Sequence, residues 1–393
     1  MRPVLLAHVS LLSAALAAPA PAQSAPAGKG LTASIDAGRA VFVAGLPCPI
    51  ELELSNGGSK PVKLDWSIAM GEGLHVRGVD LAPGAQEKQV APTLHVDMAA
   101  KPFELPPNVA VTITIDLNAV NNGAYAALCG VYDAAEVWFE ADGVKSAPAR
   151  VDLVEDLSKT LVVLDTTKGV MKLSLDPKHA PLACRNFVRH VQLGTYNGTL
   201  FHRVIKDFMA QGGDPNSRDA GNPASWGGGG APFNGKRFHA EMDPTVKFER
   251  GTLAMARNGD PLGPYGQMPL QQLLQAAQQG NQVAAAMQQR IAMMLKIEGV
   301  NVNDMKAVEA RYQELQRSGF FREPQVFLDS SGSQFFICFS RKEHLDGNYI
   351  AFGKLVAGDD VLSKIEALAA VDPNSGKPSE EIKITKASIE KLP

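Results

Sequence analysis

The segment FHRVIKDFMAQGGDP, residues 201–215, combines large apolar side chains with one arginine, one glutamine and a Gly-Gly pair. Phe201, Arg203 and Ile205 alternate as in a β-strand, which predicts that the Arg203 side chain shares a face with Phe201. A guanidinium keeps its charge at every physiological pH and presents a rigid fork of hydrogen-bond donors. A lone arginine of this kind more often pairs with an acid at the surface, so its role has to be judged from other segments.

Three further segments follow this stretch along the chain. They are LAMARNGDP (253–261), SGSQFFICFS (331–340) and EHLDGNYIAFGKL (343–355). In this order the four segments resemble the signature blocks of the cyclophilin family, whose members are peptidyl-prolyl cis-trans isomerases. The resemblance covers about Leu161 to Leu392 apart from one insertion. It implies an eight-stranded antiparallel β-barrel capped by two helices, with the active site on its outer face.

Rotation about an X-Pro peptide bond is the reaction that this resemblance implies. The barrier is ~20 kcal/mol, because the nitrogen lone pair is delocalised into the carbonyl group. Twisting the bond makes the nitrogen pyramidal and basic, so a catalyst needs a permanent donor, an apolar slot for the ring and hydrogen bonds to the flanking peptide. The reaction needs no nucleophile, metal or cofactor, and we expect none. The sequence contains neither a CxxC nor an HExxH motif.

The family pattern assigns the catalytic groups and the slot. Arg203 is the expected donor to the prolyl nitrogen, and Gln211 would either bind the substrate carbonyl or orient Arg203. The residues expected to act directly in catalysis are Arg203, Gln211 and Phe208. The slot for the proline ring would be formed by apolar side chains whose more usual place is a protein core. These side chains are Phe208, Met209, Phe336 and Leu345.

The other expected contacts lie along a groove beside this slot. Four residues would hold the peptide before the proline, and these are Ala256, Arg257, Asn258 and Gln334. In QFFICF, alternate side chains face opposite sides of a strand, so one of Phe335 and Phe336 belongs to the core and the other to the cleft. The family pattern assigns the cleft to Phe336.

Several positions depart from the common family pattern. Arg257 stands where many members have Asn, which leaves backbone contacts intact. His344 replaces a Trp that is common in eukaryotic members and lies at the rim of the pocket, so cyclosporin is expected to bind weakly. Tyr349 replaces a His near the proline slot and keeps an aromatic ring with a polar tip. His202 is expected to be structural, because strand alternation points it away from Arg203.

The N-terminus has the pattern of a secretory signal peptide. An apolar run from Val4 to Ala18 follows Met1-Arg2 and precedes Ala20-Pro21-Ala22, a small-x-small cleavage pattern. We expect residues 1–22 to be removed and residues 23–30 to form a linker, which predicts export to the periplasm or out of the cell. A membrane anchor is the alternative, although the run is short for a bilayer span of ~20 residues.

Residues 31–155 have the pattern of an antiparallel β domain. The stretches IELELSN (50–56) and VAVTITIDL (109–117) alternate apolar and polar residues. Trp66 lies between Cys48 and Cys129, as in many immunoglobulin-like sandwiches, and the two cysteines either form a disulfide or are buried free thiols. The segment has no polar cluster typical of catalysis, so a spacer is favoured over a binding module.

The isomerase domain is expected to span residues 156–393, interrupted by a helical insertion at 262–328. The insertion is rich in Gln, Ala and Met, which favour helices, with a break at Gly280-Asn281. It either packs on a neighbouring domain or forms a lid or client-binding surface through adaptable methionines, namely Met268, Met287, Met293 and Met294. The glycine-rich segment 226–235 lacks the Lys-Ser/Thr of a phosphate loop and is expected to be a flexible surface loop.

The sequence thus predicts a mainly β protein with an N-terminal immunoglobulin-like β-sandwich, then a cyclophilin-like eight-stranded antiparallel β-barrel with two capping helices and an α-helical insertion. The predicted function is isomerisation of X-Pro bonds during the folding of exported proteins. The alternative is a non-catalytic proline-peptide binding module or chaperone of the cell envelope. Proline-containing polypeptides are the expected partners. A net charge of −3 gives no field that would recruit nucleic acid or acidic lipid, and no membrane span is expected after cleavage.

Overall fold

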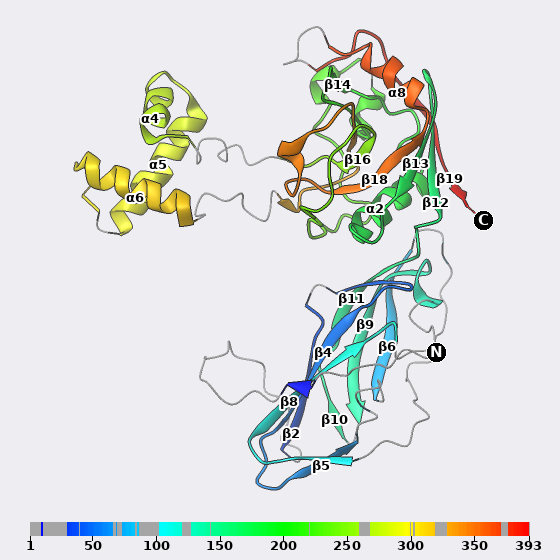
Figure 1. Ribbon diagram of the computed structural model, residues 1–393, viewed down its shortest axis with the longest axis vertical. Coiled ribbons are helices and arrows are strands. Elements are labelled where there is room, and N and C mark those ends of the chain that lie inside the picture. Colours follow the sequence, from blue (N-terminus) through cyan, green and yellow to red (C-terminus); the bar gives the residue numbers. More distant parts are fainter. Residues whose placement is uncertain are drawn as a thin grey trace.

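The structure is a computed structural model, and Figure 1 shows two β-rich parts and a group of helices. The residues that it describes are 9–10, 30–38, 40–65, 68, 73–82, 85, 102–119, 127–141, 143–219, 221–258, 268–298, 300–301, 303–318, 328–370 and 376–392. Most of the predicted signal peptide, most of the linker and Trp66 lie outside these residues. No helix among them is long and apolar enough to cross a membrane.

Two main β-sheets form the N-terminal domain. The first has the strand order β1 (Val9–Ser10), β8 (Val109–Asp116), β4 (Pro49–Asn56) and β2 (Leu31–Asp36). The second has the order β10 (Val144–Lys145), β9 (Tyr132–Ala141), β11 (Ala149–Val154) and β3 (Val41–Val43), with β6 (Leu74–Leu81) also paired to β9. A separate pair joins β5 (Val62–Asp65) to β7 (Pro102–Leu105).

One apolar core lies between these two sheets. In β4 the residues Ile50, Leu52 and Leu54 are buried while Glu51 and Glu53 are exposed, which is the alternation that the sequence predicts. The same cluster includes Val137 of β9 and Val151 of β11, so both sheets contribute to it. The predicted antiparallel β domain is therefore a two-sheet structure with a shared core.

The immunoglobulin-like assignment of this domain is not confirmed. It depended on a tryptophan between two cysteines, and Trp66 lies outside the described residues. Cys48 and Cys129 are free thiols in the structure. Both contribute to the apolar core, and burial raises the pKa of each thiol to about 12. The second of the two alternatives, two free thiols inside the core, is the one that the structure shows.

An eight-stranded antiparallel sheet forms the isomerase domain. Its strand order is β14 (Arg203–Ile205), β15 (Met209–Gly212), β17 (Phe335–Cys338), β16 (Thr252–Met255), β18 (Ala351–Ala357), β13 (Gly169–Leu175), β12 (Thr160–Thr166) and β19 (Ile384–Lys391). The sheet is curled, but its outer strands β14 and β19 share no ladder. A single bridge between Leu200 and Lys383 and the hydrogen bond from Phe201 N to Ile382 O (2.8 Å) link the two ends instead. The sheet is therefore a half-barrel rather than the fully laddered barrel that was expected.

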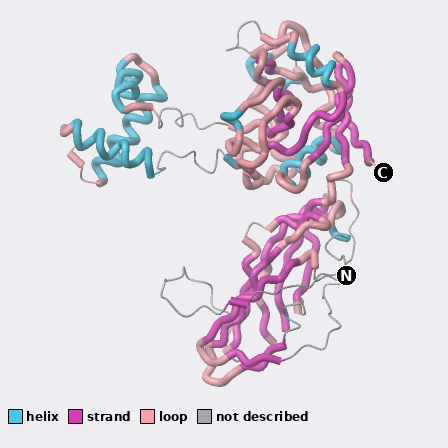
Figure 2. Tube along the Cα trace, in the orientation of Figure 1, coloured by secondary structure: helices cyan, strands magenta, loops and turns pink. Residues whose placement is uncertain are grey.

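Two helices pack on this half-barrel, as Figures 1 and 2 show. They are α2 (Pro181–Gln192) and α8 (Asp359–Glu366), and both contribute to the main apolar cluster. Three short 3-10 turns complete the domain, namely η2 (Pro215–Arg218), η3 (Pro223–Ser225) and η4 (Glu343–Leu345). Helix α2 has an apolar face that includes Phe187, Val188 and Val191, and this face covers the sheet.

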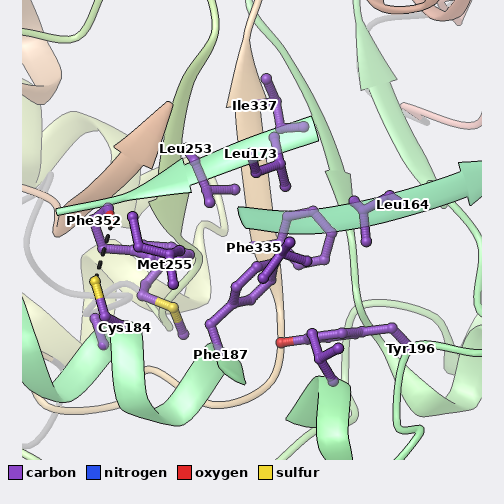
Figure 3. Packing of buried hydrophobic residues seen from close by; sticks show 14 of the residues in the cluster. Leu164, Leu173, Cys184, Phe187, Tyr196, Leu253, Met255, Phe335, Ile337 and Phe352 are labelled. Atoms are coloured by element: carbon purple, nitrogen blue, oxygen red, sulfur yellow. Dashed lines mark hydrogen bonds between the residues drawn. The ribbon is translucent and has the colours of Figure 1, made fainter. Parts of the chain in front are cut away.

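Aromatic rings fill the space between α2 and the sheet (Figure 3). Phe187 of α2 meets Phe335 of β17 edge to face, with ring centroids 5.1 Å apart, and lies at the same distance from Phe352. Tyr196 closes the cluster and donates its hydroxyl to Ser333 O (3.0 Å). Cys184 is buried in the same core and its thiol contacts Phe352 O at 3.2 Å. These residues fix the inner face of β17, whose outer face carries Phe336.

The described residues of the insertion form three helices with a core of their own. These are α4 (Leu270–Gln278), α5 (Gln282–Ile297) and α6 (Met305–Ser318). Asn281 caps α5 by accepting hydrogen bonds from Val283 N and Ala284 N, so the predicted Gly280-Asn281 break separates two helices. The described cluster of buried residues contains insertion residues alone.

The methionines of the insertion do not all lie on its surface. Met287 is buried in the helical core, and Met268 and Met294 pack against it. Met293 alone of the four is largely exposed, at 69%. Met287 is therefore not available to a client, whereas Met268 and Met294 are only partly buried, and the client-binding role stays a prediction.

Helix α2 also joins the two β domains. Arg189 contacts Asp133 Oδ1 of β9 through Nε and Nη2, each at 3.2 Å, and both side chains are 4% exposed. Arg185 donates to the carbonyl groups of Asp133 and Leu153. Val43, Val154 and Leu157 belong to the same apolar cluster as the core of the half-barrel. The N-terminal domain is thus docked on the isomerase domain through a buried ion pair surrounded by apolar contacts.

Removal of one partner from this ion pair should destabilise the protein strongly. We expect Arg189→Ala to lower the free energy of unfolding by about 3–5 kcal/mol, because the substitution leaves the Asp133 carboxylate buried without its partner. Denaturant unfolding of the full chain measures the effect. Lys364→Ala is the control, because it breaks an exposed ion pair with Asp360 and should cost less than about 1 kcal/mol. Equal effects of the two substitutions would contradict the account of the interface.

Candidate active site

A cavity of about 190 Å³ opens on the outer face of the half-barrel. Nine of the residues selected from the sequence line it, namely Arg203, Phe208, Met209, Gln211, Ala256, Arg257, Phe336, Leu345 and Tyr349. A second hollow of about 90 Å³ shares Gln211, Ala256 and Arg257 with the first, so the two hollows are continuous. Asn258 and Gln334 line this second hollow, which we call the groove.

The strand register places three of these side chains side by side on adjacent strands. Arg203 of β14 is paired with Gln211 of β15, and Gln211 is paired in turn with Phe336 of β17. Directly paired residues of an antiparallel sheet point to the same face. The outer face of three adjacent strands therefore presents a cation, an amide and an aromatic ring in one row. Their inner neighbours Val204 and Phe335 lie in the core.

One sequence-based expectation about this row is wrong. Phe201 was expected to share a face with Arg203, but it is fully buried and meets Phe335 edge to face in the core. Strand β14 begins only at Arg203, so the alternation of the strand does not extend back to Phe201. His202 is buried and does not line the cavity, and burial lowers the pKa of its ring.

Apolar side chains form the wall of the cavity opposite Arg203. Met209, Phe336 and Leu345 belong to one buried cluster, against which Phe208 and Tyr349 pack. The ring of Tyr349 stands edge-on to that of Phe336, with centroids 5.8 Å apart. Phe248 lies stacked behind Phe336 at 6.4 Å and was not foreseen, because nothing in the sequence around it matches a selected segment. A small apolar ring entering the cavity would meet these side chains on one side and Arg203 on the other.

No acid in the described part of the chain neutralises the charge of Arg203. Among the described residues it forms no ion pair, and its Nη1 donates to Gln211 Oε1 at 3.3 Å. Burial lowers the pKa of the Arg203 guanidinium. An arginine stays protonated in spite of such a shift. The surface salt bridge considered as an alternative is therefore absent from the described part of the chain.

Hydrogen bonds between amides orient the arginine. Gln211 Nε2 donates to Gln334 Oε1 at 2.9 Å, and Gln334 Nε2 donates to Gly227 O (3.0 Å) and Gly229 O (2.7 Å). Gln211 thus accepts from Arg203 with its oxygen and donates to Gln334 with its nitrogen. Two roles were considered for Gln211, namely binding the substrate carbonyl and orienting Arg203. Its contacts in the structure fit the second role.

The glycine-rich segment is a surface loop, as expected, and it also takes part in the site. Gly227, Gly228, Gly229 and Gly230 line the groove, and hydrogen bonds on both sides hold the segment. Sequence reasoning missed its part in the site because the contacts are made by backbone groups, which leave no trace in the side-chain pattern. Its only signal is the run of glycines, which permits close approach of other residues.

Two predicted residues lie at the edges of the site. The guanidinium of Arg257 lies 4.6 Å from the centroid of the Tyr349 ring, a cation–π geometry that closes one side of the cavity. His344 lines neither hollow, but its ring lies 5.9 Å from that of Phe208. His344 is thus at the rim, one residue away from Leu345 at the cavity wall.

Comparisons with known proteins identify the class of protein that this fold and site define. The family model of the cyclophilin-type peptidyl-prolyl cis-trans isomerases matches residues 161–265 and 322–389. The unmatched stretch between them contains α4, α5 and α6. Peptidyl-prolyl cis-trans isomerase-like 1 from Mus musculus is 30% identical over 228 residues, which cover 58% of this chain and 90% of that protein.

One more relative and one solved structure are also similar to this chain. Peptidyl-prolyl cis-trans isomerase cypE from Dictyostelium discoideum is 30% identical over 233 residues, covering 59% of this chain and 99% of that protein. A crystal structure of a cyclophilin-type isomerase from Cryptosporidium parvum matches with 27% identity and a TM-score of 0.39, covering 60% of this chain and 99% of that one. The chain belongs to the cyclophilin-type peptidyl-prolyl cis-trans isomerase family.

Loss of the Arg203 side chain should remove most of the activity. We expect Arg203→Ala to lower kcat/KM by about 10²–10³-fold, the usual cost of deleting one preorganised electrostatic donor. A protease-coupled assay on a short Ala-Pro peptide measures it. The kcat/KM of Arg203→Lys should lie between that of Arg203→Ala and that of the unchanged protein, because lysine keeps the charge and loses the planar fork. Activity of Arg203→Ala within about threefold of the unchanged protein would contradict the role of this residue, since a threefold change is under 1 kcal/mol.

Proposed function

We propose that the protein is an exported prolyl isomerase that accelerates X-Pro rotation in secreted or cell-envelope proteins. The observation that carries the catalytic part is an unneutralised arginine held beside an apolar slot. A fixed donor in this position stabilises the pyramidal nitrogen of the twisted bond more than the planar amide. The family membership of the chain supports the same reaction.

The dimensions of the site suit an extended peptide. The slot of about 190 Å³ is smaller than the ~300–1,000 Å³ of drug-sized ligand pockets and suits one proline ring. The groove continues from it past backbone groups of Ala256 and Asn258, which would hold the residues before the proline. Arg203 acts on the prolyl nitrogen, while Gln211 orients Arg203 and Gln334 lines the groove.

Cyclosporin is proposed to be a weak ligand. The rim residue His344 packs against Phe208 and lines neither hollow, so it offers a large cyclic ligand little contact area. A second candidate function, proline-peptide binding without turnover, has the same pocket but would not depend on the charge of Arg203. The activity of Arg203→Ala separates the two functions, because a binder shows background turnover with or without the arginine.

The N-terminal β domain is proposed to be an immunoglobulin-like spacer that positions the isomerase. Its rigid attachment through Arg189 and Asp133 supports this role, because a spacer transmits orientation only if it is fixed to the domain that it carries. The role of the helical insertion stays a prediction. It either packs on a neighbouring domain or forms a lid or client-binding surface, and its described buried cluster consists of insertion residues alone. Strand β1 lies inside the predicted signal peptide, so cleavage would leave β8 at the edge of its sheet.

Export can be tested on the N-terminus of the mature chain. We expect intact-mass measurement of the protein from a bacterial envelope fraction to give a chain that begins at Gln23, because Ala20-Pro21-Ala22 is the cleavage pattern. A variant with Ala20→Leu and Ala22→Leu removes the small residues and should keep its N-terminus. Recovery of the unchanged chain with Met1 in the soluble cell interior would contradict export, and recovery with Met1 in the membrane fraction would favour the anchor.

A further inference from the structure

The hydrogen-bonded row from Arg203 to Gln334 continues beyond the cavity. Its next members are the backbone carbonyl groups of Gly227 and Gly229, which accept from Gln334 Nε2. The amide N–H groups of the same two glycines donate to Oδ2 of Asp214, Gly229 at 3.4 Å and Gly227 at a shorter distance. Each glycine is therefore held on one side by Asp214 and on the other by Gln334.

Asp214 itself is fully buried and firmly placed. Its Oδ1 accepts a hydrogen bond from Asn216 N at 2.8 Å, at the start of the turn η2, and its own backbone carbonyl accepts from Ser217 Oγ at 2.6 Å. It lies two residues after Gly212, the end of strand β15 that carries Gln211. The carboxylate thus fixes the glycine segment relative to the strand that carries the catalytic amide.

Glycine is required where the segment passes Asp214. A Cβ atom on Gly229 would lie 2.3 Å from Asp214 Oδ1 and 2.8 Å from Asn216 Cγ. A Cβ atom on Gly230, whose φ is +92°, would lie 2.1 Å from Ser333 Oγ. Distances below 3 Å do not occur for real Cβ atoms, so the contact between Asp214 and the segment depends on the missing side chains.

The direction of every hydrogen bond in the row follows from this contact. Carbonyl groups accept and never donate, so the two glycine carbonyls oblige Gln334 to turn its NH₂ toward them and its oxygen toward Gln211. Gln211 then has to turn its NH₂ toward Gln334, which leaves its oxygen for Arg203. If the segment moved, either amide could rotate, and an NH₂ group facing Arg203 would repel the guanidinium.

We propose that Asp214 is a positioning residue for the isomerisation, which directs the Arg203 guanidinium through the glycine segment 227–230, Gln334 and Gln211. The proposal rests on the proposed role of Arg203. Asp214 touches no substrate and does not line the slot or the groove. Its contribution is to the geometry of the donor, and displacement of a catalytic group by about 1 Å can lower a rate by about 10²-fold.

Two variants of the full chain test this proposal. Asp214→Asn keeps the size of the side chain but can present its single oxygen either to Asn216 or to the glycines, not to both. Gly229→Ala keeps the carboxylate and forces it away from the segment, so it tests the same contact even if Asp214→Asn does not fold. We expect either variant to lower kcat on an Ala-Pro peptide by about tenfold to a hundredfold. For Asp214→Asn we expect KM to change by less than about threefold, because Asp214 lines neither the slot nor the groove.

The control is Glu241→Gln, which replaces another acidic side chain by its amide; burial raises the pKa of Glu241 to about 8. Glu241 also accepts two backbone hydrogen bonds, from Leu182 N and Ala183 N at 2.9 Å each, but it caps α2 away from the cavity. The Glu241→Gln variant should keep kcat within about twofold of that of the unchanged protein, a difference in activation free energy below about 0.5 kcal/mol. A loss equal to that of Asp214→Asn would show a general effect on folding and would overturn the proposal.

A double-mutant cycle separates positioning from structural support. In the Arg203→Ala background we expect Asp214→Asn to change kcat by less than about twofold, because the group that it directs is gone. An equal loss in both backgrounds would overturn the proposal, and so would unchanged kcat in folded Asp214→Asn and Gly229→Ala proteins. If Arg203→Ala itself kept full activity, the proposed role of Arg203 would fail. If Arg203→Ala lost activity while both variants kept theirs, the role of Asp214 alone would fail.

Discussion

The hydrogen bond from Arg203 to Gln211 is the interaction on which the active site depends. A cation beside an apolar slot has to be held, and a carboxylate would hold it most strongly. A carboxylate would also neutralise the charge that the twisted amide requires. The neutral amide of Gln211 gives the guanidinium a direction and leaves its charge available. An amide can rotate, however, so it needs partners of its own, and Gln334 and the glycine carbonyls provide them.

The sheet and helix α2 support this row from behind. Arg203, Gln211 and Phe336 face outward on paired strands, so their positions follow from the register of the sheet. The inward neighbour Phe335 packs on Phe187 of α2. The same helix carries Arg189, which enters the N-terminal domain to meet Asp133. A single helix therefore contributes both to the core beneath the site and to the attachment of the second domain.

Sequence reasoning foresaw what depends on side-chain pattern. The resemblance to the cyclophilin family selected the residues that line the slot and assigned Phe336 rather than Phe335 to the outer face. The composition of residues 262–328 predicted a helical insertion with a break at Gly280-Asn281. The predictions failed where backbone groups, rather than side chains, determine the contacts or the start of a strand. The glycine segment has no side chains to signal its contacts with Gln334 and Asp214, and Phe201 faces the core because strand β14 begins two residues later than the alternation suggests. Met287 of the insertion was misplaced for another reason, since composition cannot tell which face of a helix meets its neighbours.

The substitution Gln211→Glu tests the central claim most directly, because it keeps the shape of the side chain and gives Arg203 an acid partner. At neutral pH a carboxylate beside an arginine is ionised, so the introduced glutamate would neutralise the Arg203 charge and draw the guanidinium from the slot. The kcat/KM of this variant on an Ala-Pro peptide should therefore be about tenfold to a hundredfold lower than that of the unchanged protein. An isomerase as active as the unchanged protein would show that catalysis does not need an unpaired guanidinium, and the account would be wrong.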